Sequence, residues 1–441
     1  MTIKKTHGNN KLAILGGESI VSREFSFYNP IGEEEVKAAT DVIRSGKLSG
    51  YIASWGEDFL GGEKVKEFEA QCCSYFGVRH AITVNSWTSG LIAAVGAIGV
   101  EPGDEIIVPP WTMCASATAI LHWNAIPVFA DIDPVTYCIS PASVEKNISS
   151  RTRGIMSVDI GGHPADTDAL NDIAQRHNLK VISDCAQSPG AMYKKRKAGT
   201  LTDIGGYSLN YHKHIHTGEG GILVTDNDDL ALRMRLIRNH AEACIESSSH
   251  EDLSNMIGHN FRLGEIECAM GIEQLKKLDK AILTRQTAAK ELIRRLGQLK
   301  GLKVPQTNED CTHVYYMFFM QIDSSLTGVS RDLILAALKA EGVPSLSSRF
   351  SNVHLLPVFQ KKIAYGNKGF PWTSELTSRF VSYEKGICPV AESLHDYTYI
   401  GFQMCMHDCT PTEIELICCA FEKVWSNLDA LAEYGSKSFR V

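Results

Sequence analysis

The sequence has no apolar run long enough to cross a membrane, and no apolar stretch follows the two lysines near its N-terminus. A membrane-spanning helix needs about 20 apolar residues in a row. A secretory signal needs a shorter apolar stretch behind its charged start. We therefore expect neither membrane insertion nor secretion, and we predict a cytoplasmic location.

Dense blocks of lysine and arginine are also missing, and the formal net charge is −7. Such a charge balance provides no broad positive surface for nucleic acid or for an acidic membrane. The expected partners are therefore small molecules.

Cysteine occurs 13 times, but without the paired spacing of a zinc site. Two adjacent pairs, Cys72-Cys73 and Cys418-Cys419, fall in helix-like stretches. An odd number of scattered cysteines predicts reduced thiols in the core of an intracellular protein, not a disulfide framework.

Apolar runs and helix-like stretches alternate along the first half of the chain. The helix-like stretches include residues 33–45, 63–76 and 88–98, and the apolar runs include 80–84, 105–108, 126–131, 154–158 and 180–183. This alternation predicts an α/β fold, with a mostly parallel central sheet and helices on both faces.

The C-terminal part has a different pattern, with an apolar strand at 315–322, a helix at 331–341 and a last long helix at 411–431. These elements predict a smaller C-terminal α+β domain. We expect an N-terminal arm at 1–31, a large domain at 32–280 and a small domain at 281–441.

Ligands of parallel sheets bind at the carboxyl ends of the strands. The first such end, Asn85-Ser86-Trp87-Thr88, opens a helix, where free N–H groups and hydroxyls can bind phosphate. Ser86 or Thr88 could equally be an ordinary N-cap residue. This motif alone does not decide between the two interpretations.

A second strand end contains Trp111 and Met113, which share a face if the backbone is extended. Either side chain could lie flat on an aromatic ring. Packing in the core is the alternative, because tryptophan and methionine usually fill cores.

A third strand ends in Asp184, and Gln187 follows it. A buried carboxylate needs a cationic partner, because otherwise burial would neutralise it. A protonated pyridine nitrogen, an arginine or a helix N-terminus could each fill that role.

Lys213 lies between Ser208 and a glycine-rich turn, Gly218-Glu-Gly-Gly221, directly before an apolar run. Burying a lysine is costly unless its charge is paired or removed. An imine with an aldehyde removes the charge, so we interpret Lys213 as the attachment point of an aldehyde cofactor.

These strand ends together describe one ligand. A phosphate seat, a flat apolar side chain, a carboxylate for a ring nitrogen, an amide for a ring hydroxyl and a lysine for an aldehyde match pyridoxal 5'-phosphate. The sequence therefore predicts that cofactor.

The chain resembles the DegT/DnrJ/StrS family of sugar aminotransferases, a branch of the fold-type I pyridoxal phosphate enzymes. The resemblance covers nearly the whole chain and is carried by Gly16-Gly17, Pro102-Gly-Asp-Glu105, Asp184-Cys-Ala-Gln187, Gly218-Glu-Gly-Gly221 and Pro389-Val-Ala-Glu392. It implies a fold-type I aminotransferase-like fold whose large domain binds the cofactor.

The resemblance also implies site roles. Lys213 matches the Schiff-base lysine and Asp184 the partner of the pyridine nitrogen, so both are predicted to be catalytic. Gln187 matches the residue that faces the ring hydroxyl. Ser208, Thr88 and the backbone N–H of Trp87 match phosphate ligands.

Asn260 is similar to an asparagine that family members send to the phosphate of the neighbouring subunit. A homodimer with shared active sites follows from that similarity. The sequence departs from the family pattern at Trp87, where glycine is usual, and at Met113, which aligns with the common aromatic stacker.

The activity implied by the resemblance is transfer of an amino group from glutamate or glutamine to a keto sugar, in particular a nucleotide-linked one, or to a keto cyclitol. In this mechanism, Lys213 moves a proton between the donor and the cofactor. Candidate substrate contacts are His163, Arg262 and Arg349. Segments 49–61 and 364–382 are expected to shape the acceptor pocket.

Two other interpretations stay open at this point. In a strand, His212, His214 and His216 would share a face and could bind a transition metal. Against this, no carboxylate or cysteine lies at useful spacing, so no metal is predicted. The chain could also be a regulator that keeps the cofactor without turnover.

Overall fold

The computed structural model describes residues 11–245 and 254–438. The first part of the predicted N-terminal arm, residues 1–10, lies outside these ranges.

The large sheet has seven described strands in the order β1-β9-β8-β5-β4-β2-β3. Their bounds are His80–Val84 (β1), Glu105–Val108 (β2), Ile126–Phe129 (β3), Thr152–Val158 (β4), Lys180–Asp184 (β5), Ile204–Ser208 (β8) and Gly221–Thr225 (β9). Strands β8, β5, β4, β2 and β3 are parallel neighbours, whereas β9 runs antiparallel between β8 and β1. The predicted α/β class with a mainly parallel sheet is confirmed.

Alternate residues of β9 show that both faces of this end of the sheet are covered. Leu223 packs in the cluster that contains α3 and α7, whereas Ile222 and Val224 pack in the cluster that contains α2 and α9. Successive side chains of a strand point to opposite faces. The strand is therefore apolar from Ile222 to Val224, as expected for a strand buried on both sides.

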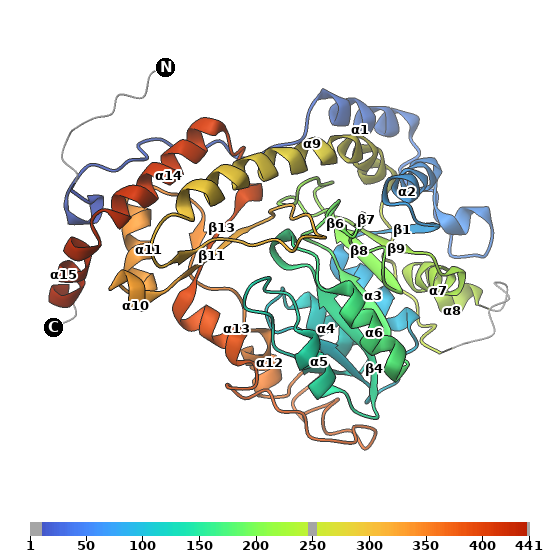
Figure 1. Ribbon diagram of the computed structural model, residues 1–441. Coiled ribbons are helices and arrows are strands. Elements are labelled where there is room, and N and C mark those ends of the chain that lie inside the picture. Colours follow the sequence, from blue (N-terminus) through green and yellow to red (C-terminus); the bar gives the residue numbers. More distant parts are fainter. Residues whose placement is uncertain (1–10, 246–253, 439–441) are drawn as a thin grey trace.

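The helices of the large unit surround this sheet (Figure 1). Their bounds are Glu33–Ser45 (α1), Glu63–Phe76 (α2), Trp87–Ala97 (α3), Ala115–His122 (α4), Pro141–Asn147 (α5), Thr167–His177 (α6), Asp228–Arg238 (α7), Ala241–Cys244 (α8) and Glu265–Leu296 (α9). A short hairpin, Met192–Tyr193 (β6) with Arg196–Lys197 (β7), completes it.

The smaller C-terminal part is built on an antiparallel sheet in the order β10-β11-β13-β12. Its elements are Leu302–Lys303 (β10), Phe318–Ile322 (β11), Ser324–Thr327 (α10), Arg331–Ala340 (α11), Leu346–Ser347 (β12), Pro357–Gln360 (α12), Pro389–Ser393 (α13), Tyr399–Phe402 (β13), Pro411–Trp425 (α14) and Leu428–Ser438 (α15). This smaller C-terminal part confirms the second half of the fold prediction. The domain boundaries themselves stay a prediction.

Helix α9 connects the two units, because it packs against α1 and α2 at one end and against α14 at the other (Figure 1). The N-terminal residues Leu12, Val21 and Phe25 share a hydrophobic cluster with the small sheet. The first described residues therefore pack on the C-terminal part of the chain.

Two predicted elements of the C-terminal part differ from the structure. The predicted helix at 411–431 is two helices, α14 and α15, separated where Ser426 and Asn427 bond through their side chains to the carbonyls of Glu422 and Lys423. Such bonds compete with helix continuation. The predicted strand at 315–322 begins only at Phe318, because Tyr315 has a left-handed φ of 52°.

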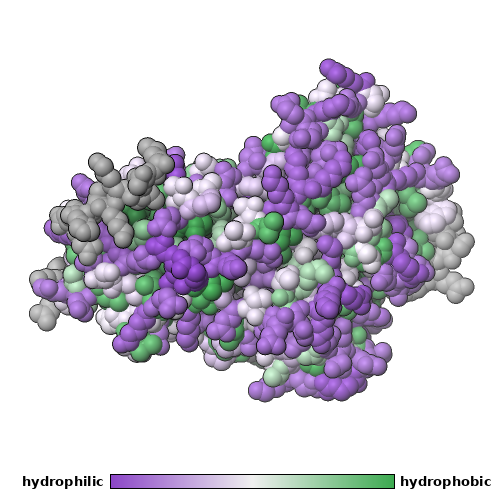
Figure 2. Space-filling view, turned by 45° about the horizontal axis from the view of Figure 1, so that its top comes forward, coloured by the Kyte–Doolittle hydropathy of each residue, from purple (hydrophilic) through white to green (hydrophobic). Residues whose placement is uncertain are grey.

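The face around α1 and α9 is mostly hydrophilic, with hydrophobic residues scattered between polar ones (Figure 2). Among the described residues, no helix has the length and apolar character needed to cross a membrane.

Glu69 of α2 joins three elements of the large unit. Its Oε1 accepts hydrogen bonds from the backbone N–H of Thr83 at 2.9 Å and from Arg238 Nη1 at 2.6 Å, and Arg238 is fully buried. Removing one partner of a buried ion pair leaves the other charge uncompensated. We therefore expect Glu69→Gln to lower the free energy of unfolding by about 3 kcal/mol in urea denaturation.

The matched control for Glu69→Gln is Glu67→Gln on the same helix. Glu67 pairs with Lys64 at 2.6 Å, but both side chains are more than a third exposed. An exposed pair of this kind contributes about 1 kcal/mol or less. Equal losses of stability in the two variants would contradict the bridging role of Glu69.

Candidate active site

A cavity of about 190 Å³ lies where β4 and β5 end and α3 begins. Most of the predicted site residues line it, namely Trp87, Thr88, Met113, Asp184, Gln187, Ser208 and Lys213. These residues come from separate segments of the chain and meet at the carboxyl edge of the sheet, where α/β folds bind ligands.

A second hollow of about 480 Å³ adjoins this cavity and shares Met113, Gln187 and Lys213 with it. It extends toward Tyr316 and Arg349 of the C-terminal part. The shared residues mean that a molecule in the larger hollow would reach the side chains of the smaller one.

Lys213 is buried on the wall that the two hollows share. Burial lowers the pKa of its amine to about 8, although the negative charge of Asp184 acts in the opposite direction. Its Nζ lies 4.4 Å from the centre of the Tyr316 ring. Within residues 11–245 and 254–438, no carboxylate forms an ion pair with it, which fits an amine that forms an imine.

Asp184 ends β5 and is almost completely buried. Its Oδ1 accepts hydrogen bonds from the indole N–H of Trp87 at 2.7 Å and the backbone N–H of Ala186 at 3.2 Å. Its Oδ2 accepts one from the hydroxyl of Ser116 at 2.8 Å. A carboxylate held in this way on the cavity wall suits a protonated ring nitrogen as its remaining partner.

The N-terminus of α3 faces the same cavity. Ser86 is the N-cap residue, because its hydroxyl accepts from the backbone N–H of Ser89 at 3.1 Å. Thr88 and, from β8, Ser208 line the cavity beside it. The hydroxyls and the helix N-terminus together make a suitable seat for a phosphate group.

Gln187 and Met113 complete the cavity. The Oε1 of Gln187 accepts from the backbone N–H of Gly161 at 2.7 Å. Its amide NH₂ has no acceptor within residues 11–245 and 254–438, so it can donate to a ring hydroxyl. Met113 is 60% exposed and lines both hollows. Trp111 is fully buried against Phe350 and Tyr399, which argues against a stacking role for it and leaves Met113 for that role.

Comparison with known proteins decides the family of this chain. Residues 30–386 match the DegT/DnrJ/EryC1/StrS aminotransferase family. The chain belongs to this family. It is therefore an aminotransferase that depends on pyridoxal phosphate, as the residues in the cavity indicated.

Individual relatives of the aminotransferase agree with this assignment. The spore coat polysaccharide biosynthesis protein SpsC of Bacillus subtilis is 33% identical over 77% of this chain and 86% of its own length. The L-glutamine:scyllo-inosose aminotransferase of Streptomyces griseus is 35% identical over 73% of this chain and 76% of its own. The solved aminotransferase from Psychrobacter cryohalolentis has a TM-score of 0.77 at 28% identity and covers 92% of this chain and 100% of its own.

Asn260 is not among the described residues that line the two hollows at Lys213. Its Oδ1 accepts from Arg262 Nε at 2.7 Å, and its carbonyl accepts from Asn85. The side chain is exposed. A role toward the phosphate of a neighbouring subunit stays a prediction.

The three histidines around Lys213 do not share one face, as the alternative metal-binding interpretation requires, because this segment is a series of turns and not a strand. His214 is buried and contacts the carbonyl of Val314 at 2.8 Å, and burial lowers its pKa to about 3. His212 lines the cavity, and burial lowers its pKa to about 4. In the described part of the chain, no three potential ligands gather around a metal site.

Of the three predicted substrate contacts, one lies at the site. Arg349 lines the larger hollow. His163 is buried, with Nδ1 2.7 Å from the carbonyl of Pro164, and Arg262 bonds to Asn260. Neither of these two is among the described residues that line the hollows.

The two segments expected to shape the acceptor pocket lie elsewhere in this chain. Residues 364–382 contact the start of β2 and the end of α4, where Arg379 pairs with Glu105 at 2.6 Å and Tyr365 bonds to the carbonyl of Leu121 at 2.8 Å. Residues 49–61 border a different hollow beside α1 and α2. Within the described chain, neither segment lines the two hollows at Lys213.

Three residues at the site were missed from the sequence. Ser116 bonds to Asp184, Tyr316 lies beside Lys213, and Asn210 lines the cavity with a buried Oδ1 that has no hydrogen-bond partner among the described residues. Asn210 could have been predicted from the sequence, because it lies two residues after Ser208 in the segment that leads to Lys213. Ser116 follows Met113 by three residues, whereas Tyr316 lies far from the motifs in sequence.

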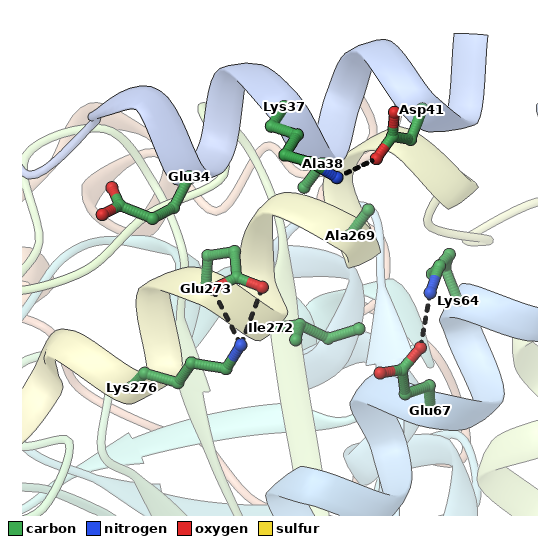
Figure 3. A pocket seen from close by; sticks show the side chains of 10 residues that line it. All are labelled: Glu34, Lys37, Ala38, Asp41, Lys64, Glu67, Ala269, Ile272, Glu273 and Lys276. Carbon is green, nitrogen blue, oxygen red and sulfur yellow. Dashed lines mark hydrogen bonds and ion pairs between the residues drawn. The ribbon is translucent and has the colours of Figure 1, made fainter. Parts of the chain in front are cut away.

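Another hollow, of about 380 Å³, lies between α1, α2 and α9 (Figure 3). Its charged side chains pair with one another, as Lys37 does with Asp41 and Lys64 with Glu67. None of the predicted site residues is among the described residues that line it. The cavity at Lys213 is therefore the candidate active site.

The lowered pKa of Lys213 predicts how fast the cofactor-free protein takes up pyridoxal phosphate. Only the neutral amine attacks an aldehyde, and the pKa is about 8. The rate of growth of the visible absorbance band should rise about tenfold per pH unit below that value and level off above it. A rate that kept rising to pH about 10, as for an ordinary lysine, would contradict the lowered pKa.

Proposed function

We propose that this aminotransferase moves an amino group from glutamine or glutamate to the keto group of a sugar or a cyclitol. The relative from Streptomyces griseus is named for such a reaction, with L-glutamine as donor and the keto cyclitol scyllo-inosose as acceptor. The same chemistry serves a nucleotide-linked keto sugar, because the reacting group is a ketone in both cases.

The position of Lys213 is the observation that carries the proposal. The lysine is buried without an ion pair among the described residues, and it shares a cavity with the Asp184 carboxylate and the N-terminus of α3. A lone amine, a fixed carboxylate and a phosphate seat at one cavity are the groups that pyridoxal phosphate requires.

Each residue has a defined task in this proposal. Bound pyridoxal phosphate supplies an electron sink for the carbanion that forms at the reacting carbon of the donor or the acceptor. Lys213 anchors the cofactor, and once displaced it moves a proton as a general base and acid. Asp184 keeps the ring nitrogen protonated, and Ser208 with the start of α3 holds the phosphate.

The larger hollow is the proposed place of the donor and the acceptor. Its wall carries neutral hydrogen-bonding side chains, including Ser347, Ser351 and Gln403, together with the cation of Arg349. We assign Arg349 to the donor's carboxylate, because a guanidinium binds a carboxylate through two parallel hydrogen bonds. The neutral side chains then bind the hydroxyls of the acceptor.

We also propose that the enzyme is a homodimer and works in the cytoplasm. Support for the dimer comes from Asn260, whose exposed side chain lies outside the hollows of this chain. Support for the location comes from the thirteen cysteines, none of which forms a disulfide within the part of the chain that the structure describes. Sedimentation of the purified protein tests the first proposal, and localisation of a tagged chain tests the second.

The proposed reaction is tested by incubating the holoenzyme with L-glutamine or L-glutamate and one of two ketones, scyllo-inosose or a nucleotide-linked keto sugar. We expect the amine product of one ketone to appear in mass spectrometry, together with the oxo acid of the donor. If the protein binds pyridoxal phosphate but forms no amine with either ketone, the result would favour the alternative of a regulatory protein that binds the cofactor without turnover.

A further inference from the structure

Trp87 occupies an unusual position, at the first residue of α3 with its side chain turned into the protein. The side chain is 6% exposed. The indole lies directly over Gly206 of β8, where an added Cβ atom would meet the ring at 2.2 Å, and beside Gly90, where it would meet the ring at 2.7 Å. Both positions therefore require glycine as long as the indole is there.

The indole reaches the carboxylate that the proposed function assigns to the ring nitrogen. Its Nε1–H donates to Asp184 Oδ1 at 2.7 Å, across 97 residues of sequence. An indole N–H can only donate, and its direction is fixed by the ring. The carboxylate is thus held by a rigid donor.

The other side-chain donor to Asp184 is less constrained. The Ser116 hydroxyl bonds to Asp184 Oδ2 at 2.8 Å, but it also lies 2.9 Å from the hydroxyl of Thr112. A hydroxyl can rotate between two such partners. Of the two side chains, Trp87 is therefore the one that sets the orientation of the carboxylate.

We propose that Trp87 is a positioning residue for cofactor binding, which holds the Asp184 carboxylate toward the cavity through its indole N–H. The inference rests on the proposed role of Asp184. Because Trp87 also lies at the start of α3, one residue connects the phosphate seat with the carboxylate for the ring nitrogen. A shift of the helix start would then disturb both contacts with pyridoxal phosphate.

The test is Trp87→Phe, which keeps an aromatic ring over Gly206 and removes the N–H. The matched control is Trp123→Phe, because the Trp123 indole is also buried and donates at 2.7 Å, but to the carbonyl of Ile92 and not at the cavity. Both variants are compared with the wild-type full chain by titration with pyridoxal phosphate and by the pH dependence of the visible absorbance band.

We expect Trp87→Phe to weaken pyridoxal phosphate binding about tenfold or more, as for loss of a hydrogen bond to a charged group. The pH at which the band titrates should shift as well. Trp123→Phe should change neither quantity, and Trp87→His, which restores a ring N–H, should recover part of the affinity. In an Asp184→Asn background, Trp87→Phe should have no further effect, because it acts through the carboxylate.

Three outcomes would overturn the inference. These are an unchanged affinity in Trp87→Phe, an equal loss in the Asp184→Asn background, and an equal loss in Trp123→Phe. If Trp87→Phe does not fold, the same criteria apply to Trp87→Leu, which also lacks the N–H, with Trp123→Leu as its control. A wild-type chain that binds no pyridoxal phosphate would overturn the proposed function together with this inference, whereas wild-type binding with an unaffected Trp87→Phe would overturn the inference alone.

Discussion

Replacing Lys213 with alanine should abolish turnover and remove the visible absorbance band of the holoenzyme. Lys213 supplies the buried amine that lines both hollows, so its loss removes the anchor of the cofactor and the proton carrier together. Loss of a general base alone costs about a hundred- to ten-thousandfold in rate. We expect a fall of at least about a thousandfold in kcat, measured as amine formed per enzyme.

The Lys213→Arg variant tests whether turnover requires the amine of Lys213 or only a positive charge at this position. Arginine keeps a positive charge but stays protonated and forms no imine, so this variant should be as inactive as the alanine variant. Lys197→Ala is the control, because Lys197 is also a partly buried lysine that lies over an aromatic ring, at 3.7 Å from Tyr75, but is outside the cavity lining. A Lys213→Arg enzyme that kept both the band and the turnover would exclude Lys213 as the anchor.

Replacing Asp184 with asparagine should give the second largest effect. The amide has nearly the same shape, and its oxygen can still accept from Trp87 while its NH₂ donates to the Ser116 hydroxyl, but it carries no charge to keep a ring nitrogen protonated. Removing a fixed electrostatic partner of a reacting group lowers kcat by about a hundred- to a thousandfold. Turnover should fall by this amount, while some pyridoxal phosphate remains bound through Lys213.

A second buried carboxylate provides the control for Asp184. Asp159 lies nearby and accepts hydrogen bonds from Ser188 at 2.8 Å and Ala165 at 2.9 Å, and burial raises its pKa to about 6. It is not among the described residues that line the cavity. Asp159→Asn should therefore affect stability more than kcat, and equal losses of kcat in the two variants would argue against the assigned role of Asp184.

Much of the fold follows from local patterns in the sequence. Helix α1 and helix α2 begin and end at the predicted residues, because their apolar residues recur at helical spacing and Gly46 or Gly77 adopts the left-handed conformation that ends each helix. The predicted helix at 411–431 was wrong, because side-chain bonds to the helix carbonyls compete with a favourable periodicity.

Each site residue that could be predicted lies either at or just after the end of a strand, or in the segment from Ser208 to Gly221 that contains Lys213. Asp184 directly ends β5, and Ser208 ends β8. The topology of a parallel sheet brings such ends to one edge. The sequence by itself therefore determined the α/β class, the cofactor and the residues that gather around Lys213.

Only the tertiary structure decided how these residues are held. The bond between Trp87 and Asp184, the core position of Trp111 and the separate environments of the histidines depend on how α3, the sheet and the C-terminal part pack together. Local sequence specifies the conformation of the backbone. The direction of a side chain and its partner far along the chain are set by close packing, which a pattern of residue types does not encode.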